Sequence, residues 1–207
     1  MGYISAHPDL DLTYAAGPGD SWATSTLTVD TDASLSLPRS QTGVLIYIKT
    51  TSGALLPLDW CSRNQKLTVT SSCAAETVAA HEGITQVIPI TPCFANAPAT
   101  HRTDNSALLH NIGRGYTERL CFLNRSLRLR TGMIHDINSQ GIVRSQHVRT
   151  DDNLADHLTK VLQRLKHQAA VERIALTRSI APSAPPQHDD LAALLEEATL
   201  LDNQPTN

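Results

Sequence analysis

The sequence has little charge, few aromatic side chains and no long apolar run. Charged residues make up 18% and aromatic residues 4% of its 207 residues. No stretch approaches the roughly 18 consecutive apolar residues that span a membrane, so a transmembrane protein is excluded. The first residues lack the basic and apolar regions of a secretory signal, and we therefore expect an intracellular protein, cytoplasmic or nuclear.

The sequence also lacks closely spaced cysteines. Its four cysteines are separated by 12, 20 and 28 residues, at Cys61, Cys73, Cys93 and Cys121. None of these spacings is that of a zinc knuckle or a redox motif, so we expect buried free thiols and no cysteine-bound zinc.

Charge is unevenly distributed along the chain. Residues 100–150 hold eight arginines, three acidic residues and no lysine, within a chain whose formal net charge is -3. Arginine binds phosphate oxygens through two parallel hydrogen bonds, which favours a nucleic-acid surface. The candidate phosphate-binding residues are Arg114, Arg119, Arg125 and Arg128. A solvated helix face is the alternative interpretation of the same pattern.

Periodicity predicts strands in the first part of the chain and helices later. The expected strands cover residues 27–30, 43–49, 54–60, a short stretch ending at 103–104, and 142–148. The expected helices cover residues 72–88, 106–112, 116–133 and 153–167. Ser72 is the expected N-cap of the first helix, and Pro57 predicts an edge strand or a bulge. This order predicts a mixed α/β domain.

Four carboxylates fall at the ends of these elements. Asp30 ends the first strand, Glu76 and Asp156 lie in first turns of helices, and Asp104 ends the fourth strand. An α/β fold brings such positions together, and grouped carboxylates repel one another unless a divalent cation neutralises them. Carboxylates favour Mg²⁺ or Mn²⁺, and two such ions about 4 Å apart support phosphodiester cleavage. Solvated acids at the ends of elements are the alternative.

Several segments resemble the ribonuclease H domain of copia-type long-terminal-repeat retrotransposons. Val29–Ala33 reads Val-Asp-Thr-Asp-Ala, similar to the Asp-x-Asp motif of that family, and Arg39–Gly43 resembles its Arg-Ser-x-x-Gly. Asp59–Gln65 and Ser71–Glu76 resemble the tryptophan and glutamate segments of the family, with the same 16 residues from tryptophan to glutamate.

The later segments are similar to the same family. Asp104–Ala107 resembles the Asp-Asn-Gln-Ser-Ala motif with one residue missing, and Val148–Lys160 contains the Asp-Asn-Leu-Ala-Asp-x-Leu-Thr-Lys pattern. Gly2–Tyr14 resembles the segment that connects reverse transcriptase to ribonuclease H. The family proline before the last motif is Arg149 here, and Ser34 replaces an aromatic residue.

The resemblance implies a ribonuclease H-like fold, with a mixed five-stranded sheet flanked by helices. It implies that residues 1–24 are a remnant of the reverse transcriptase connection and that residues 25–167 are the ribonuclease H domain. The proline-rich and acidic composition of the remaining residues, 168–207, predicts a linker and an acidic, disordered tail. The resemblance also implies that two Mg²⁺ or Mn²⁺ ions bind to Asp30, Glu76, Asp104 and Asp156.

Three further residues are possible accessories to that site. Asp32 shares a face with Asp30 if the strand continues, although an acid in a turn is the simpler interpretation. Asp151 either assists product release or caps the last helix, and His157 either transfers protons near the metals or lies in solvent.

The expected function is cleavage of the RNA strand of RNA–DNA hybrids by a metal-dependent endonuclease, with a reverse transcriptase domain as a possible separate partner and no membrane partner. The alternative is a decayed or domesticated domain that binds nucleic acid or a protein without cutting. A two-metal nuclease acting on structured DNA is a third hypothesis that shares the fold.

Overall fold

The structure is a computed structural model that describes residues 10–12, 14–15, 17–94, 97–115, 125–174 and 176–178. One compact unit covers residues 13–176, and a second comprises residues 1–12 with 177–207. The predicted linker and acidic tail, Arg119 and Cys121 lie outside the described residues. A separate two-stranded sheet pairs β1 (Leu10–Leu12) with β7 (Leu176–Arg178).

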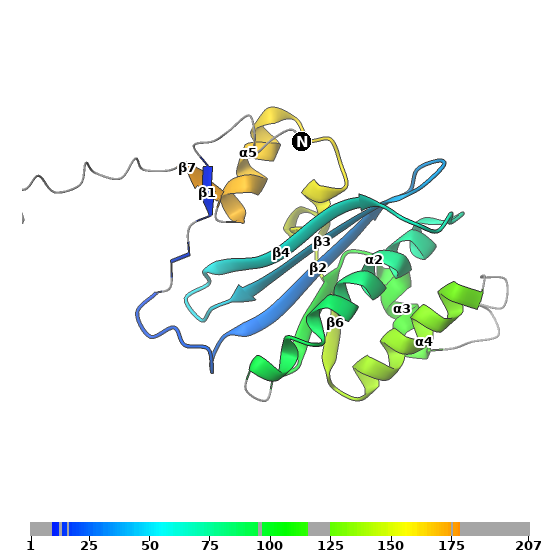
Figure 1. Cartoon of the computed structure of the whole chain (residues 1–207), viewed down its shortest axis with the longest axis horizontal. Coiled ribbons are helices and arrows are strands. Elements are labelled where there is room, and N and C mark those ends of the chain that lie inside the picture. Colours follow the sequence, from blue (N-terminus) through cyan, green and yellow to red (C-terminus); the bar gives the residue numbers. More distant parts are fainter. Residues whose placement is uncertain are drawn as a thin grey trace, which may run out of the picture. The chain divides into compact units, whose positions relative to one another are not determined.

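The main sheet has five strands in the order β4-β3-β2-β5-β6. They are β2 (Thr26–Ser34), β3 (Gln41–Lys49), β4 (Leu55–Asn64), β5 (Ala99–Thr103) and β6 (Val143–His147). The pairs β2–β3 and β3–β4 are antiparallel, whereas β2–β5 and β5–β6 are parallel (Figure 1). The sheet is therefore mixed, as the sequence predicts.

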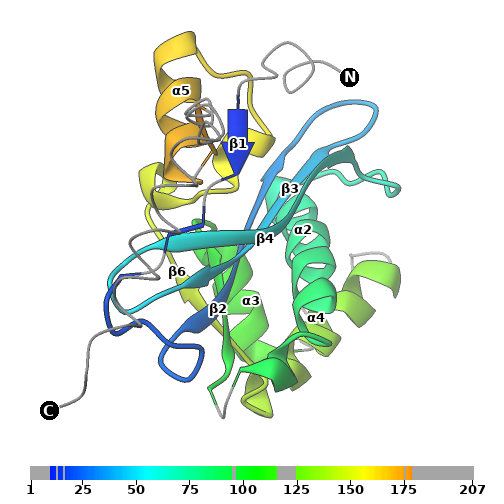
Figure 2. The same cartoon turned by 60° about the vertical axis from the view of Figure 1, so that its left-hand side comes forward.

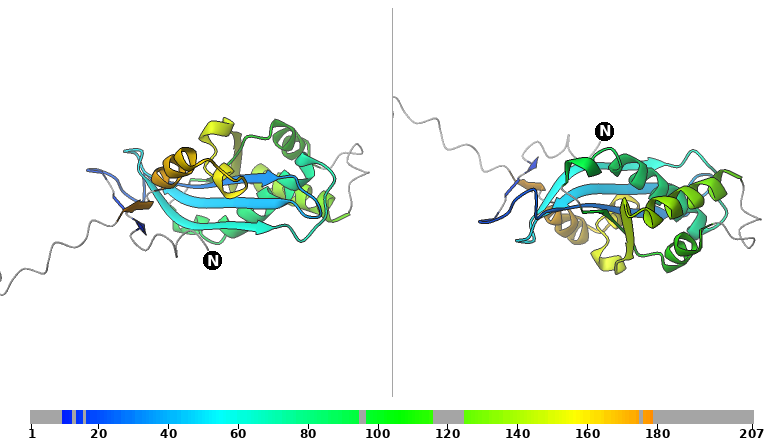
Figure 3. Two further views of the ribbon diagram at one scale, coloured as in Figure 1. Left: turned by 90° about the horizontal axis from the view of Figure 1, so that it is seen from above. Right: turned by 90° about the horizontal axis from the view of Figure 1, so that it is seen from below.

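The helices are α2 (Ser72–Val87), α3 (Ser106–Arg114), α4 (Arg125–Ser139) and α5 (Arg164–Arg173), with short 3-10 turns η1 (Thr91–Cys93), η3 (Thr150–Asp152) and η4 (Asp156–Leu158). Helices α2 and α4 run side by side in both of the first two views (Figures 1 and 2). Turn η4 and helix α5 lie across the sheet from α2 (Figure 3).

Local sequence signals account for most of these boundaries. The side chain of Ser71, one residue before the expected cap, accepts a hydrogen bond from the backbone N–H of Ala74 at 3.2 Å and begins α2. Asn105 caps α3 in the same way. Strand β4 is an edge strand with a shift in register opposite Ile46 and Tyr47, as Pro57 predicts.

Three expected elements differ from the structure. Strand β2 continues to Ser34 instead of ending at Asp30, because residues 31–34 pair with β3. The helix expected over residues 153–167 is wrong for its first part, which contains only the short turn η4, because the side chain of Asn153 bonds to the backbone carbonyl of Thr31 at 3.0 Å; α5 begins at Arg164. Helix α4 begins at Arg125 and extends to Ser139, and residues 116–124 of the expected helix lie outside the described residues.

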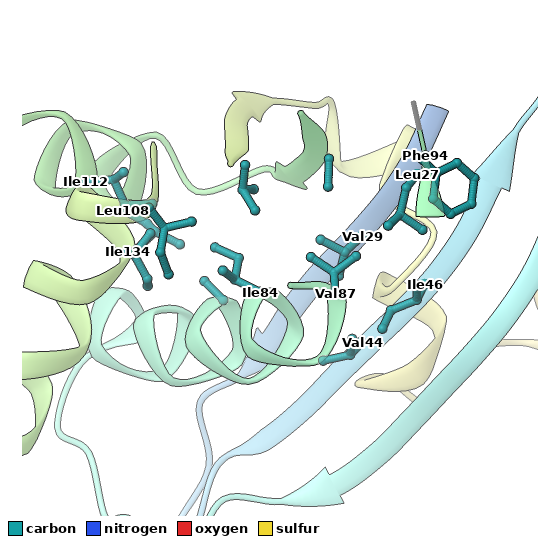
Figure 4. Packing of buried hydrophobic residues seen from close by; sticks show 14 of the residues in the cluster. Leu27, Val29, Val44, Ile46, Ile84, Val87, Phe94, Leu108, Ile112 and Ile134 are labelled. Atoms are coloured by element: carbon teal, nitrogen blue, oxygen red, sulfur yellow. The ribbon is translucent and has the colours of Figure 1, made fainter. Parts of the chain in front are cut away.

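The main core lies between the sheet and the helices on one of its faces. Ile84 and Val87 of α2 pack among side chains from β2 and β3, including Val29 and Val44 (Figure 4). The same cluster extends to Leu108 and Ile112 of α3 and Ile134 of α4. Every second residue of β2 therefore faces the helices, and the residues between them face the opposite side.

The three described cysteines, Cys61, Cys73 and Cys93, are free. Cys61 and Cys73 are half-buried and Cys93 is exposed, so the expectation of buried thiols is only partly met. No helix in the described part of the chain has the length and apolar character needed to cross a membrane.

Close contact between α2 and the sheet makes Gly83 sensitive to substitution. A Cβ at this position would lie 2.7 Å from Cγ2 of Thr31 and 2.9 Å from Cγ2 of Val29. Overpacking of this kind costs about 1–3 kcal/mol, so Gly83→Ala is expected to lower the free energy of unfolding measured in urea by that amount.

Gly132 of α4 provides the matched control, because a Cβ there meets no atom within 4 Å. Gly132→Ala is expected to stabilise the protein by about 0.5–1 kcal/mol through helix propensity. Equal effects of the two substitutions would contradict the close packing of α2 on the sheet.

Candidate metal-binding site

Three carboxylates from separate parts of the chain meet on the face of the sheet opposite α2. Oxygen atoms of Asp32, Asp104 and Asp156 all lie within 4.8 Å of one another. Asp32 belongs to β2 and is 3% exposed, Asp104 directly follows β5, and Asp156 begins η4. Parallel pairing of β2 with β5 brings the first two together, because the carboxyl ends of parallel strands lie at one edge.

Glu76, in the first turns of α2, is the fourth carboxylate near this group. Burial, together with the charges of Asp32 and Asp104, raises its pKa to about 9. Its Oε2 atom is buried, and no described residue donates a hydrogen bond to it. This buried and unsatisfied carboxylate oxygen, beside three other carboxylates, fits a site that holds a divalent cation.

A positive charge and a hydroxyl group near the cluster partly offset the repulsion among its carboxylates. Burial raises the pKa of Asp32, the nearby charges of Asp104 and Asp156 add to this effect, and the hydroxyl of Thr159 donates a hydrogen bond to it. Lys160 forms an ion pair with Asp156. Although burial alone would lower the pKa of Lys160, the nearby carboxylates raise it above its ordinary value.

Asp30 lies on the same face of β2 but outside the group of three. Its side chain is fully buried, and its carboxylate pairs with the guanidinium of Arg102. It accepts hydrogen bonds from Arg102 Nε at 2.7 Å, Arg102 Nη2 at 2.6 Å, Tyr47 Oη at 3.1 Å and Leu154 N at 2.9 Å. These bonds fill the about four lone-pair positions of a carboxylate, two on each oxygen.

The structure therefore differs from the sequence expectation at one position. Of the expected residues Asp30, Glu76, Asp104 and Asp156, the structure places Asp104 and Asp156 in the group of three, with Asp32 there instead of Asp30. Glu76 lies near this group, and Asp32 lies in a strand and not in a turn. Arg102 precedes Asp104 by two residues, as Asp30 precedes Asp32, but this spacing becomes informative only once the register of the two strands is known. In parallel register, that spacing pairs Asp30 with Arg102 and leaves Asp32 beside Asp104.

The two possible accessory residues after β6 occupy different environments. Asp151 is exposed in η3, where its backbone carbonyl accepts a hydrogen bond from Arg173. His157, in η4, is half-buried, and burial lowers its pKa. Both line a cavity of about 270 Å³ between the two turns and α5, to which Asp156 also contributes.

The arginines expected to bind nucleic acid lie on two helices. Arg114 ends α3 and Arg125 begins α4, and both are exposed. Arg128 is half-buried on α4. Arg125 and Arg128 border an apolar groove of about 790 Å³ whose lining includes Leu129 and Met133.

The strand order and pairing, with helices packed on the sheet, define a ribonuclease H-like fold. A solved structure of the prototype foamy virus protease–reverse transcriptase shares this fold, with a TM-score of 0.50 and 14% sequence identity. The match covers 73% of this chain and 23% of the viral chain.

Two further solved structures similar to this chain are ribonucleases H. The N-terminal ribonuclease H domain of a Mycobacterium tuberculosis protein, solved as a fusion with maltose-binding protein, has a TM-score of 0.45 and 13% identity, over 71% of this chain and 96% of that chain. A ribonuclease H1 isolated from compost, solved with an RNA/DNA hybrid, has a TM-score of 0.44 and 16% identity. The match covers 64% of this chain and 93% of that chain. No protein-family model matches the sequence, and no curated protein matches it.

Proposed function

We propose that this protein is a metal-dependent endonuclease that cleaves the RNA strand of RNA–DNA hybrids. The observation that carries the proposal is the meeting of Asp32, Asp104 and Asp156 at one point, with Glu76 beside them. These residues are far apart in the sequence, and repulsion among their charges opposes their grouping unless the site binds a cation.

The proposed ligands of the cations are Asp32, Glu76, Asp104 and Asp156. When bound, two Mg²⁺ or Mn²⁺ ions would supply Lewis-acid stabilisation of the phosphate charge and make the attacking water more acidic. The side chain of Glu76, whose pKa is raised, would have to lose its proton to act as a ligand. The ribonuclease H-like fold and the resemblance of the sequence motifs to those of copia-type retrotransposons support the same activity.

The test of this function is cleavage of a labelled RNA–DNA hybrid by the full chain. We expect RNA fragments in Mg²⁺ or Mn²⁺, none in EDTA, and no cleavage of the DNA strand or of a DNA duplex with the same sequence. A protein that binds hybrid without cutting either strand would contradict the proposal and support a binding-only domain. Cleavage only after addition of a separate reverse transcriptase domain would identify that domain as a required partner.

We propose that the exposed arginines on α3 and α4 contact the phosphates of the hybrid. Affinity is then expected to fall steeply with salt, with a log–log slope of about -0.9 for each phosphate neutralised. The double substitution Arg114→Glu and Arg125→Glu should weaken binding and make the slope shallower by about 2, measured by fluorescence anisotropy in a series of salt concentrations.

Lys49→Glu is the matched control for this measurement. Lys49 is exposed at the end of β3 that pairs with Thr26, whereas Asp32 pairs with Gly43 near the other end of the strand. The control reverses a charge away from the cluster and should leave the slope unchanged. A slope that no arginine substitution alters would assign these arginines to a solvated helix face.

A further inference from the structure

The ion pair between Asp30 and Arg102 links two neighbouring strands directly below the carboxylate cluster. Asp30 and Arg102 are register partners on the parallel strands β2 and β5. Asp32 follows Asp30 by two residues, and Asp104 follows Arg102 by two residues. The distance between the two strands at the ion pair therefore determines how far apart the backbones of Asp32 and Asp104 lie.

The same ion pair also holds the segment that leads to the third carboxylate. Arg102 Nη2 donates a hydrogen bond to the backbone carbonyl of Asp152 at 3.0 Å, and Asp30 accepts one from the backbone N–H of Leu154. Asn153, between them, bonds to the carbonyl of Thr31 on β2. Residues 152–154 are thus fixed to both strands, and Asp156 follows two residues later.

Neither residue of the pair is available to bind a cation directly. The lone pairs of Asp30 are already occupied by hydrogen bonds, and Arg102 is a permanent cation whose side chain is 17% exposed. The guanidinium also lies over the ring of Tyr47, 5.8 Å from its centroid, which restricts its orientation further. A buried pair bonded in this way to Tyr47 of β3 and to residues 152–154 has few alternative geometries.

We propose that Asp30 and Arg102 are positioning residues that set the distances among Asp32, Asp104 and Asp156 and thereby determine the cation affinity of the site. The inference rests on the proposed function, because it assigns a role in cation binding to residues that do not touch the cation. A purely structural ion pair would stabilise the sheet and leave the affinity of the folded protein unchanged.

Arg102→Lys in the full chain tests this inference. Lysine retains the positive charge beside Asp30, but a single ammonium does not reproduce the planar fork that bonds both oxygens of Asp30 and the carbonyl of Asp152. We expect the Mn²⁺ dissociation constant, measured by isothermal titration calorimetry on folded protein, to rise about 10- to 100-fold. We also expect faster amide hydrogen exchange in residues 152–158, measured without metal.

Ile84→Val is the control, because it removes a methylene from the core on the opposite face of the sheet. Where its loss of melting temperature is smaller than that of Arg102→Lys, Ile84→Ala takes its place so that the two losses match. The control should leave both Mn²⁺ affinity and exchange in residues 152–158 unchanged. If Arg102→Lys does not fold, the double variant Asp30→Asn/Arg102→Gln, which leaves no charge uncompensated, undergoes the same measurements.

Unchanged Mn²⁺ affinity in the variant would overturn the inference, even if exchange becomes faster, because the pair would then be a structural contact alone. An equal loss of affinity in the core control would overturn it as well, because the effect would follow global stability. A wild-type protein that binds no Mn²⁺ would overturn the proposed function together with this inference. That failure is distinguishable because it appears before any substitution is made.

Discussion

Asp32→Asn is expected to abolish metal-dependent cleavage of the RNA–DNA hybrid, reducing the rate by at least about a thousandfold, or roughly 4 kcal/mol of activation free energy. Asp32 shares the cluster with Asp104 and Asp156, and its charge is required to hold the cations. Without metal, the same substitution removes a buried charge that two neighbouring carboxylates repel. The melting temperature in EDTA should therefore stay constant or rise, and the increase on adding Mn²⁺ should be lost.

Asp30→Asn is the matched comparison, because it is the same substitution two residues away on the same face of β2. It leaves the buried guanidinium of Arg102 without its carboxylate partner, and breaking a buried ion pair costs about 3–5 kcal/mol. The melting temperature in EDTA should therefore fall sharply in this variant alone. The opposite result would be cleavage retained by Asp32→Asn, together with a stable Asp30→Asn variant whose melting temperature no longer rises with Mn²⁺. It would show that Asp30, and not Asp32, binds the metal.

The stability of the metal-free protein is expected to decline as pH rises from about 7 to about 9, because of Glu76. Below pH 7 the buried His101, whose pKa is lowered to about 4, has the opposite effect. Burial and the neighbouring carboxylates raise the pKa of Glu76 from 4.5 to about 9 in the folded protein. Between these values the folded state retains a proton that the unfolded state has lost, so the contribution of Glu76 to the free energy of unfolding falls with pH. The limiting slope for one such group is about 1.4 kcal/mol per pH unit.

Glu76→Gln should remove this decline, because glutamine is uncharged throughout the range. At pH 8 in EDTA we expect the variant to be more stable than the wild type by on the order of 2 kcal/mol, which corresponds to roughly 4–8 °C. Thermal denaturation at several pH values, with EDTA and with Mn²⁺, measures both effects. Mn²⁺ should stabilise the wild type increasingly as pH rises, because the ligand must be deprotonated.

Glu172→Gln serves as the control for the pH series, since Glu172 is exposed on α5. It should leave the pH dependence of the wild type intact. A wild-type protein whose stability rises between pH 7 and 9 in EDTA would show that Glu76 is charged in the folded state, and would contradict its placement among the other carboxylates.

The sequence by itself determined most of the secondary structure, because those signals are local. A serine beside an alanine-rich segment begins α2, Asn105 begins α3, and Pro57 coincides with the irregular edge strand β4. The motifs also indicated Glu76, Asp104 and Asp156, since each stands in a short pattern that can be compared with a family.

Only the tertiary structure decided between Asp30 and Asp32. The two residues differ by one period of a strand, so alternation places both on the same face and does not distinguish them. The parallel register of β2 with β5 pairs Asp30 with Arg102, and that contact joins residues 72 positions apart in the sequence. Asp32 lies beside Asp104 for the same reason.

In the segment after β6, too, long-range contacts and not the local sequence pattern decided the structure. The pattern of residues 153–167 favours a helix, but contacts with β2 occupy the side chain of Asn153 and the backbone N–H of Leu154. These long-range hydrogen bonds replace the first turns of the expected helix, and α5 begins only at Arg164. Helix propensity does not decide the structure of this segment, because its buried polar groups form hydrogen bonds with polar groups of β2. These partners come together only when the sheet has formed.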